Sequence, residues 1–334
     1  MKNLLTFKRG LVAATLIATS AVTFAKEVTI GYQGMFNPWK HAIAEKILEK
    51  ETGYDIKWRR FDSGAKAITA MASGAVAMTS AGSSPIAAAV SRGVEMELVW
   101  ILENIAEAEA LVVTDEIKSP EDLKGKRIAV PFVSTTHFHM LFALEHYGLT
   151  EKDVKLINMQ PSAISAAWQR GDIDGAFIWD PALGTLKKTG HVLVSSKELA
   201  ALGKPTFDGF VVNKKFGQED PEFVAKVIKT MATLDAQYRD SKATFDASNP
   251  IAVSISKITG GDINTVAEVL ALYDFPTMEQ QLSCEWLGCG ADGAATKALQ
   301  ATSEFLLEQK KINELMPDYS EFVNPSYAEA ASKL

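Results

Sequence analysis

Cysteine is almost absent from the sequence, since Cys284 and Cys289 are the only two among 334 residues. They enclose the four residues EWLG, and the two further ligands that a zinc site would need are not nearby. Neither cysteine adjoins the apolar N-terminal segment, so none is available there for a lipid anchor. In an oxidising compartment the two cysteines are expected to form a local disulfide.

Long apolar runs are missing beyond the N-terminus. Residues 1–10 carry three basic and no acidic side chains, residues 11–22 are apolar or small, and Thr-Phe-Ala at 23–25 offers a small-x-small cleavage site. The pattern predicts a secretory signal peptide over residues 1–25, because its apolar core is too short to span a bilayer. Export without a lipid anchor predicts a periplasmic protein, with free secretion as the less favoured alternative.

Positive charge is in short supply. The sequence has 34 Lys and Arg against 41 Asp and Glu, a formal net charge of −7. Removing residues 1–25 takes away three positive charges and leaves a net charge of −10. A chain this acidic, without a basic stripe, argues against nucleic acid and anionic membrane as partners. About 309 mature residues are enough for two lobes with separate cores.

The mature sequence opens with a β-α-β-α-β pattern. EVTIGYQG (27–34) alternates like a strand, and PWKHAIAEKILEKETG (38–53) predicts one amphipathic helix that ends at Gly53. YDIKWRRF (54–61) predicts the second strand, AKAITAMASG (65–74) the second helix and AVAMTS (75–80) the third strand. A unit of this kind forms a parallel sheet whose faces are covered by helices.

The same order of elements returns from residue 126. KRIAVPF, DVKLINM and DIDGAFIW predict three strands, and the helices HFHMLFALEHYG and ISAAWQRG lie between them. Two such units predict the fold class: an α/β protein of two lobes, each a mostly parallel sheet flanked by helices. Ligands of such sheets bind at the carboxyl ends of the strands, which here meet across a cleft between the lobes.

Two similar segments predict the hinge. EALVVTDE (109–116) leaves the first unit and DGFVVNKK (208–215) follows the second, each with an acid shortly before a Val-Val strand. We therefore expect lobe 1 over 26–111, lobe 2 over 112–209, and a return to lobe 1 with mostly C-terminal helices over 210–334.

VSTTHFHM (133–140) is open to three interpretations. His137 and His139 could bind a metal, but they are two residues apart and point to different faces of a helix. Ser134 could be a nucleophile, but it lacks the G-x-S-x-G context of a hydrolase. The remaining interpretation is a strand end followed by a helix start, where hydroxyls and free N–H groups cap the helix or hold an anion. No metal and no cofactor are expected.

AGSSP (81–85) repeats this arrangement in the first unit, with Gly82 for close backbone approach and Pro85 in the first helical turn. The loops at the strand ends are expected to line the cleft; they span 32–36, 62–64, 82–84, 133–137, 160–162 and 179–180. They contain no Arg or Lys, and Lys66 lies just beyond them, whereas a carboxylate site more often uses an arginine. Neutral donors suit a sulfate or sulfonate. The acids Glu109 and Asp208 at the hinge would suit an ammonium group, or could be solvated residues at strand starts.

The motif GDIDG (171–175) also suggests a metal through Asp172 and Asp174. A glycine that ends a helix, followed by a turn into the next strand, explains the same letters better.

Several stretches closely resemble one family: FDSGAKAITAMASG, GSSP, EALVV, GKRIAVPFVSTTH, AAWQRGDIDGAFIW and DYSEFV. They are similar to the periplasmic taurine-binding proteins of ABC importers, which belong with the aliphatic-sulfonate binders among type II periplasmic binding proteins. The resemblance implies a monomeric solute-binding protein rather than an enzyme, with taurine or another small sulfonate as ligand and a membrane permease as partner. The implied sulfonate-side residues are Ser83, Ser84, Thr135, Thr136 and His137; Glu109 and Asp208 match on the amine side, with Trp179 as a cleft aromatic. The strand ends themselves add Gln33, Phe36, Asp62 and Asp180 as expected cleft-lining residues, and Phe210 stands where the family usually has a cleft tryptophan.

The sequence departs from this family at Asp180, Phe210, the YQGMFNPW loop and the CEWLGCGADG segment. These differences leave taurine, hypotaurine, other short aminosulfonates and alkanesulfonates open as ligands. The rival from another class is an enzyme related to the pyrimidine-synthesising proteins of the thiamine pathway, against which the signal peptide and the hydroxyl-rich cleft argue.

Overall fold

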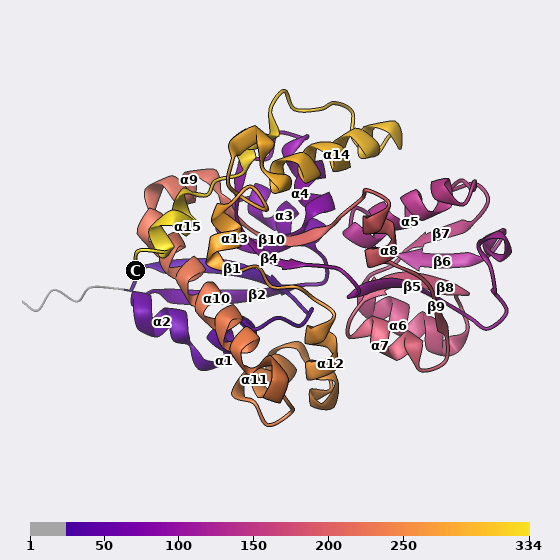
Figure 1. Cartoon of the computed structure of the whole chain (residues 1–334), viewed down its shortest axis with the longest axis horizontal. Helices are drawn as coiled ribbons and strands as arrows, with labels where there is room; N and C mark the ends of the chain where they lie inside the picture. Colours follow the sequence, from indigo (N-terminus) through magenta and orange to yellow (C-terminus); the bar gives the residue numbers. More distant parts are fainter. Residues whose placement is uncertain (1–24) are drawn as a thin grey trace, which may run out of the picture.

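A computed structural model describes residues 25–334. The predicted signal peptide falls almost entirely outside the described residues. Within them, no helix has the length and apolar character needed to cross a membrane. Figure 1 shows two bodies side by side, one around the indigo N-terminal strands and one around the magenta middle of the chain, with the long connections running between them.

Lobe 1 is built on a five-stranded sheet of order β2-β1-β3-β10-β4. The strands are β1 (Glu27–Gln33), β2 (Asp55–Phe61), β3 (Met78–Gly82), β4 (Met96–Asn104) and β10 (Phe207–Asn213). β1 is parallel to β2 and β3, whereas β10 runs antiparallel to both of its neighbours. The sheet is therefore mostly parallel, as predicted.

Lobe 2 repeats this order with the strands β7-β6-β8-β5-β9. They are β5 (Glu109–Val113), β6 (Arg127–Val130), β7 (Lys155–Asn158), β8 (Gly175–Trp179) and β9 (His191–Ser195). Here β5 is the antiparallel strand, between β8 and β9. Each lobe thus receives its antiparallel strand directly after the chain has crossed from the other lobe, so that β5 and β10 begin where the parallel strands end.

Helices cover both sheets, and the C-terminal helices gather on lobe 1 (Figure 1). The α-helices are α1 (Lys40–Glu45), α2 (Ile47–Thr52), α3 (Gly64–Ala72), α4 (Ser83–Val90), α5 (Thr135–His146), α6 (Pro161–Arg170), α7 (Ala182–Lys187), α8 (Ser196–Ala201), α9 (Lys214–Glu219), α10 (Pro221–Ser241), α11 (Pro250–Thr259), α12 (Val266–Ala271), α13 (Met278–Leu282), α14 (Ala294–Glu308) and α15 (Ser326–Ala331). Short 3-10 turns are η1 (Pro120–Leu123), η2 (Lys242–Thr244), η3 (Ile263–Thr265), η4 (Gly290–Asp292) and η5 (Tyr319–Phe322).

The helix predicted over 38–53 is wrong in one respect, because the structure has two short helices there. Lys46 lies in the left-handed region with a φ of 52° and separates α1 from α2. The predicted stop at Gly53 is confirmed, since Gly53 has a φ of 72° and its N–H donates to the carbonyl of Glu49. Glycine adopts this conformation without the steric penalty of a Cβ.

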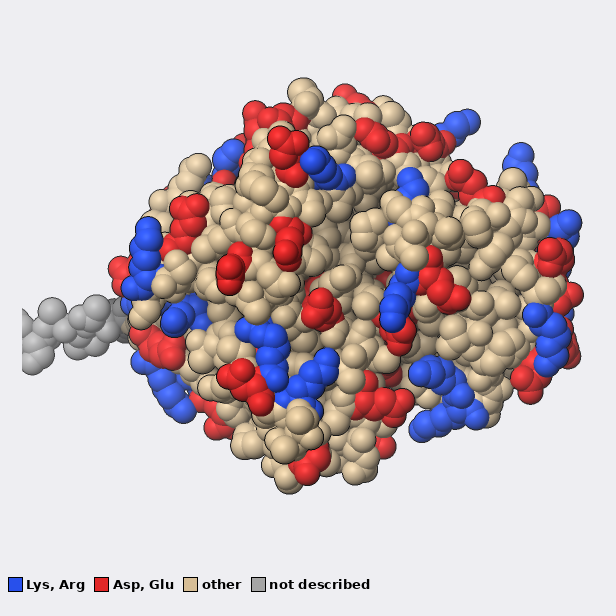
Figure 2. All heavy atoms as spheres, in the orientation of Figure 1, with Lys and Arg blue, Asp and Glu red and all other residues tan. Residues whose placement is uncertain are grey.

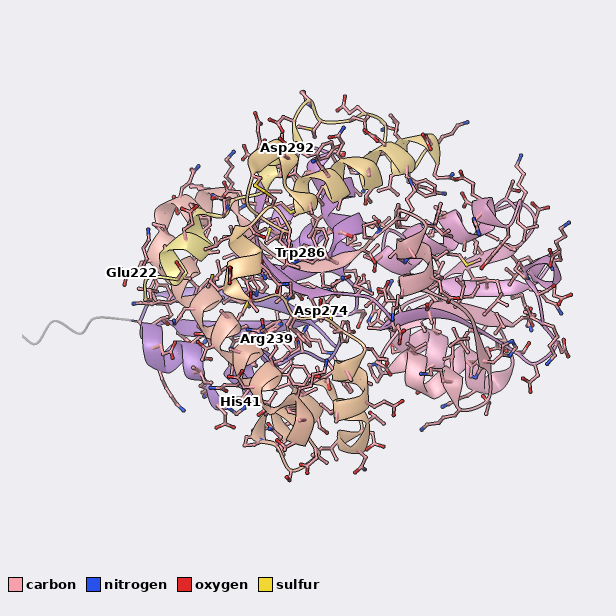
Figure 3. The ribbon with its side chains drawn as sticks, in the orientation of Figure 1. His41, Glu222, Arg239, Asp274, Trp286 and Asp292 are labelled. Carbon is pink, nitrogen blue, oxygen red and sulfur yellow. A yellow bond between two sulfur atoms is a disulfide. The ribbon has the colours of Figure 1, made fainter. Side chains whose placement is uncertain are left out.

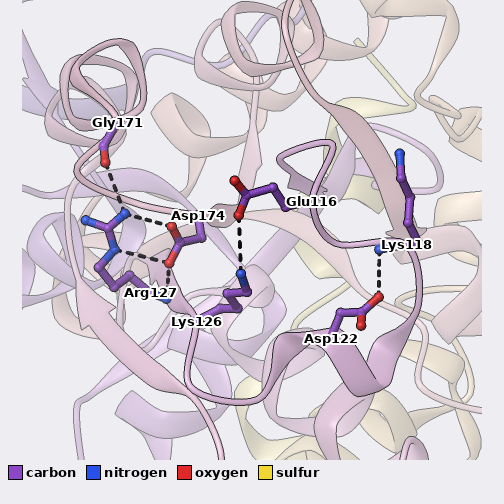
Figure 4. Close-up of polar contacts among 7 residues, drawn as sticks. All are labelled: Glu116, Lys118, Asp122, Lys126, Arg127, Gly171 and Asp174. Carbon is purple, nitrogen blue, oxygen red and sulfur yellow. Dashed lines mark hydrogen bonds and ion pairs between the residues drawn. The ribbon is translucent and has the colours of Figure 1, made fainter.

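The GDIDG turn is held by an ion pair within lobe 2 (Figure 4). Arg127 Nη2 lies 2.7 Å from Asp174 Oδ1, and the backbone N–H of Arg127 donates to Asp174 Oδ2 at 2.7 Å. Arg127 also donates to the carbonyl of Gly171 at 3.0 Å. The pairing lowers the pKa of Asp174. Asp174 therefore ties β6 to β8, in agreement with the turn interpretation of the motif.

The segment that follows α12 returns to the crossing between the lobes. Asp274 exchanges backbone hydrogen bonds with Asn104 at the end of β4, at 2.8 and 3.2 Å. Arg239 donates to the carbonyls of Phe275 and Pro276 at 3.1 and 3.2 Å and fixes the next turn (Figure 3). This pairing places Tyr273 beside the cleft.

Cys284 and Cys289 form a disulfide. The loop that they close carries Trp286, whose ring packs edge-on against Phe207 at 5.8 Å (Figure 3). Just before the loop, Gln281 bonds both the N–H and the carbonyl of Ile101, at 3.0 and 2.7 Å. The segment thereby covers the edge strand β4, whose backbone would otherwise be open to pairing.

Candidate functional site

A pocket lies between the lobes where the strands end. Lobe 1 supplies the loop after β1, the start of α4 and the start of β10; lobe 2 supplies the starts of β5 and α5 and the end of β8. We call it the solute pocket, and its walls are Gln33, Met35, Gly64, Gly82, Pro85, Glu109, Ser134, Thr135, Trp179, Asp208 and Tyr273. Five of the predicted site residues are therefore brought together here: Gln33, Glu109, Thr135, Trp179 and Asp208.

Glu109 is buried at the first position of β5. Thr135 donates to its Oε1 at 2.5 Å, and Ser196 Oγ lies 3.4 Å from its Oε2. Burial, together with the neighbouring charge of Asp208, raises the pKa of Glu109 to about 8 despite these hydrogen bonds. The hydrogen-bond partners of this buried carboxyl group are neutral hydroxyls. A cationic ligand would stabilise its charged form.

Asp208 stands opposite two residues of its own sheet, Gly82 on β3 and Glu103 on β4. Burial raises the pKa of Asp208 to about 7 and raises that of Glu103 well above its usual range. The two carboxyl groups also repel each other, and this repulsion favours the protonated form of the pair. We refer to Glu103, Glu109 and Asp208 as the acid cluster.

One buried lysine faces the acid cluster from lobe 1. Lys40 on α1 donates to Asn37 Oδ1 at 2.8 Å, and Asn37 donates in turn to Glu103 Oε1 at 3.2 Å. Burial lowers the pKa of Lys40 to about 7, against the attraction of Glu103 and Asp208. Lys40 thus acts on Glu103 and Asp208 but not on Glu109, which leaves Glu109 to be paired by a cation in the pocket.

The start of α5 has the predicted strand-to-helix geometry. Ser134 is the N-cap residue: its hydroxyl donates to the carbonyl of Pro131 at 2.6 Å and accepts from the N–H of His137 at 3.1 Å. Thr136 lies 2.7 Å from Ser134 Oγ and does not line the pocket. Of this turn, Ser134 and Thr135 line the solute pocket, and the hydroxyl of Ser134 is engaged in the helix cap.

His137 is turned away from the solute pocket. Its ring stacks on Phe132 with centroids 4.5 Å apart, and its Nδ1 accepts from the N–H of Val133 at 3.2 Å. Burial lowers its pKa to about 4, so the ring is neutral. Since Nδ1 is bonded to the backbone, His137 is not placed to take a proton from Ser134, and the pair is not a nucleophile with its base.

His139 is buried and bonded at both ring nitrogens. Nε2 donates to the carbonyl of Lys204 at 2.8 Å, and Nδ1 lies 2.7 Å from the hydroxyl of Ser196. Burial lowers its pKa to about 4. Among residues 25–334 no three His, Cys, Asp or Glu side chains are grouped as metal ligands. His139 instead supports Ser196, which lies behind Glu109.

The start of α4 approaches lobe 2 closely. A Cβ on Gly82 would lie 2.7 Å from Thr135 Cγ2, so the absence of a side chain at residue 82 lets the lobes meet. Ser83 and Ser84 are buried behind this turn. Ser83 Oγ accepts from the N–H of Phe207 at 3.4 Å, whereas Ser84 Oγ has no partner among the described residues.

The other predicted residues lie outside the solute pocket. Phe36 and Phe210 are fully buried in the cores of lobe 1, and Phe210 packs against Trp39 at 5.7 Å. Asp180 accepts from the N–H of Gly184 at 3.0 Å and lines a separate depression. Asp62 lines an adjoining compartment of the cleft. Phe210 lies within β10, where alternation directs its side chain into the core, whereas Phe36 follows β1 in a loop and packs in a separate core cluster.

Two walls of the solute pocket and one member of the acid cluster carry no clear signal in the sequence. Tyr273 lies sixty residues after the end of β10 and reaches the cleft only through the pairing of Asp274 with Asn104. Met35 lies in the loop after β1, at a strand end expected to face the cleft, but its apolar side chain does not mark it as a site residue. Glu103 looks like the polar end of an apolar strand, and only its register opposite Asp208 shows that it belongs to the acid cluster.

Two α/β lobes with a pocket between them, closed by polar strand ends and helix starts, define the class: a type II periplasmic binding protein fold. The model of the substrate binding domain of the ABC-type glycine betaine transport system matches residues 26–250. The chain therefore belongs to this family of substrate-binding domains of ABC importers.

Three known proteins illustrate the relationship. The taurine-binding periplasmic protein of Escherichia coli strain K12 is 38% identical over 321 residues, which are 96% of this chain and 98% of that protein. The crystal structure of the alkanesulfonate-binding protein SsuA from Xanthomonas axonopodis pv. citri bound to MOPS superposes with a TM-score of 0.70 at 24% identity and covers 91% of this chain and 99% of the other. The desulfurization enzyme DSZB shares the fold, with a TM-score of 0.62 at 15% identity and coverage of 92% and 99%.

Proposed function

We propose that this protein is the periplasmic solute-binding component of an ABC importer and that it captures taurine or a closely related short aminosulfonate between its lobes. The observation that carries the proposal is the polarity of the solute pocket. Glu109 and Asp208 lie in the same pocket as Thr135 and the helix starts at Gly82 and Ser134. One small molecule with a cationic and an anionic end satisfies both sides.

In this arrangement the ammonium group lies against Glu109 and Asp208. These acids reach the pocket from different lobes, so an ammonium between them joins the lobes. The cation also compensates charge that Lys40 alone leaves unbalanced. A buried carboxylate without a partner is costly, and pairing it with the ligand therefore favours amines over neutral sulfonates.

The sulfonate group lies toward the starts of α4 and α5, where free backbone N–H groups supply donors, and the hydroxyl of Thr135 joins them by turning from Glu109 to the ligand. The arginine fork that commonly binds carboxylates is absent from the walls of the solute pocket. The taurine-binding relative supports this ligand class.

We place the protein in the periplasm as a monomer that delivers its ligand to a membrane permease, with no catalytic step.

A thermal-shift screen tests the proposal. Burial of a ligand between the lobes stabilises the fold by RT ln(1 + [L]/Kd), about 2.7 kcal/mol at a hundred-fold excess over Kd. Taurine and hypotaurine should rank above isethionate and ethanesulfonate, and β-alanine should rank last. The amount of taurine should not change during prolonged incubation, because a binding protein consumes nothing. If β-alanine outranks every sulfur oxyanion, the assignment fails.

A further inference from the structure

A second compartment of the cleft adjoins the solute pocket. It lies between Arg60 and Asp62 of lobe 1 and Pro161, Ser162 and Trp179 of lobe 2. We call it the outer compartment. Trp179 is a wall of both spaces, and the loop after β1 separates them, since Gln33 and Met35 face the solute pocket while Gly34 faces the outer compartment. The two spaces are neighbours in one interlobe cleft.

Arg60 gives the outer compartment its charge. One guanidinium nitrogen donates to the carbonyl of Thr259 at 3.0 Å, and within residues 25–334 Arg60 takes part in no ion pair. A Cβ on Gly34 would lie 2.7 Å from Nη2, so the glycine makes room for the guanidinium. The other charged wall, Asp62, is paired with Lys66 at 2.9 Å. The compartment thus offers an uncompensated cation to a ligand.

The position of the acid cluster relates this cation to the ligand. Glu109 is paired with Trp179 in the register of β5 and β8, so the ammonium end of the ligand lies next to the wall shared with the outer compartment. The charge of Arg60 is close enough to lower the pKa of Lys40, which faces the same acids. A substituent on the amine-bearing carbon would therefore point toward Arg60.

We propose that the outer compartment binds a second anionic group on the amine-bearing carbon of an aminosulfonate, so that the protein also takes amino-sulfo-carboxylates, for which L-cysteate is the simplest probe. The proposal rests on the proposed function. Arg60 holds the carboxylate, the hydroxyl of Ser162 adds a donor, and Trp179 covers the carbon between the two spaces. Without the arginine, a carboxylate so near Glu109 and Asp208 would be repelled.

Isothermal titration of the mature chain with taurine, L-cysteate and 3-aminopropanesulfonate tests this. L-cysteate should bind, and Arg60→Gln should weaken it by about tenfold or more, the effect of losing a charge-assisted hydrogen bond. Taurine and 3-aminopropanesulfonate, which lack the second anion, should change by less than about threefold. Arg60→Lys should restore part of the L-cysteate affinity, because it keeps the charge but not the fork.

Arg92→Gln is the matched control, because Arg92 is also an exposed arginine that donates to a backbone carbonyl, that of Lys311, away from the cleft. It should leave every ligand unaffected. The proposal is overturned if taurine binds but L-cysteate does not, or if Arg60→Gln weakens taurine and L-cysteate equally. L-cysteate binding that depends on Arg60, without any taurine binding, would support the compartment and refute the proposed function alone.

Discussion

Gly82 of lobe 1 lies against Thr135 of lobe 2, with room for a hydrogen but not for a methyl group. We predict that Gly82→Ala holds the lobes apart and weakens taurine binding at least about tenfold, because overpacking of this kind typically costs about 1–3 kcal/mol. Titration calorimetry measures the loss, and small-angle scattering should show a smaller compaction on adding taurine. We expect the lobes to separate at this point when no ligand is bound, so the melting temperature of the ligand-free variant is the control and should stay close to wild type.

Asp208→Asn should discriminate between amines and other sulfonates. Removing one of the acids that face the ammonium should cost taurine about 2–5 kcal/mol, whereas ethanesulfonate has no ammonium to lose. Both affinities are measured in the same titration series. Glu107→Gln is the matched control, because Glu107 is an exposed acid of the crossing that pairs with Lys197. An equal loss for taurine and ethanesulfonate would assign Asp208 to the hinge instead of the ligand.

The ligand-free protein should become less stable as the pH rises from about 5 to 7. The pKa of Glu109 is raised from 4.5 to about 8, so in this window the folded chain binds more protons than the unfolded chain, and the free energy of unfolding falls as pH rises. The raised pKa values of Asp208 and Glu103 act in the same direction. The lowered pKa values of His137 and His139, about 4, oppose this slope below about pH 6.5, and the lowered pKa of Lys40, about 7, opposes it above about pH 7, so the carboxyl groups set the net direction between them. Chemical denaturation at several pH values measures the slope.

Glu109→Gln should flatten this slope, because the variant side chain does not titrate. Saturating taurine should flatten it too, since a bound ammonium lowers the pKa of the acids. Taurine binding near pH 7 should accordingly release protons, which calorimetry in buffers of different ionisation enthalpy detects. A slope that is the same in wild type and Glu109→Gln would show that this carboxyl group is already ionised in the ligand-free protein.

The repeated order of strands and helices is enough to predict the two lobes, because alternating apolar segments and glycine stops are local signals. The same logic finds Gln33, Glu109, Thr135, Trp179 and Asp208, since the carboxyl ends of parallel strands lie at one edge. It cannot tell which side of a turn a hydroxyl occupies. Thr135 and Thr136 are adjacent and alike in sequence, yet only Thr135 faces the solute pocket.

Contacts between distant segments account for what the sequence does not reveal. Tyr273 reaches the cleft through backbone pairing with β4, and Glu103 joins the acid cluster through its register with β10. Lys46 adopts a left-handed conformation and divides α1 from α2. The break has no glycine or proline, so the sequence does not predict it. Arg60 belongs to the predicted strand 54–61 and not to a loop. The loops at the strand ends therefore predict a cleft without a cation, and Arg60 is missed.

Thr135→Val and Thr136→Val should separate binding from stability. Thr135→Val removes a hydroxyl that faces the solute pocket and should weaken taurine by about 1.5–3 kcal/mol. Thr136→Val removes a bond to Ser134 inside the helix cap and should lower the unfolding free energy by about 1 kcal/mol with little change in affinity. Calorimetry and denaturant melts on both variants give the two quantities. Equal losses of affinity would place both hydroxyls on the ligand.

His139→Ala should unfold more easily and still bind taurine in excess EDTA. Its side chain is buried, donates to Lys204 and meets Ser196, so its removal leaves a cavity and buried polar groups without partners, at a cost on the order of 2 kcal/mol or more. Helical rotation predicts that His139 faces away from the ligand, and its bonds lie behind Glu109, so the affinity should fall far less than the stability. His191→Ala, at a partly exposed histidine that pairs with Asp115, is the control and should change stability by less than about 0.5 kcal/mol.

A metal site would give the reverse pattern, because both His137 and His139 would then be required and the chelator would abolish binding. Taurine binding that survives EDTA, together with a destabilised His139→Ala, therefore distinguishes a packed structural histidine from a ligand of a metal ion.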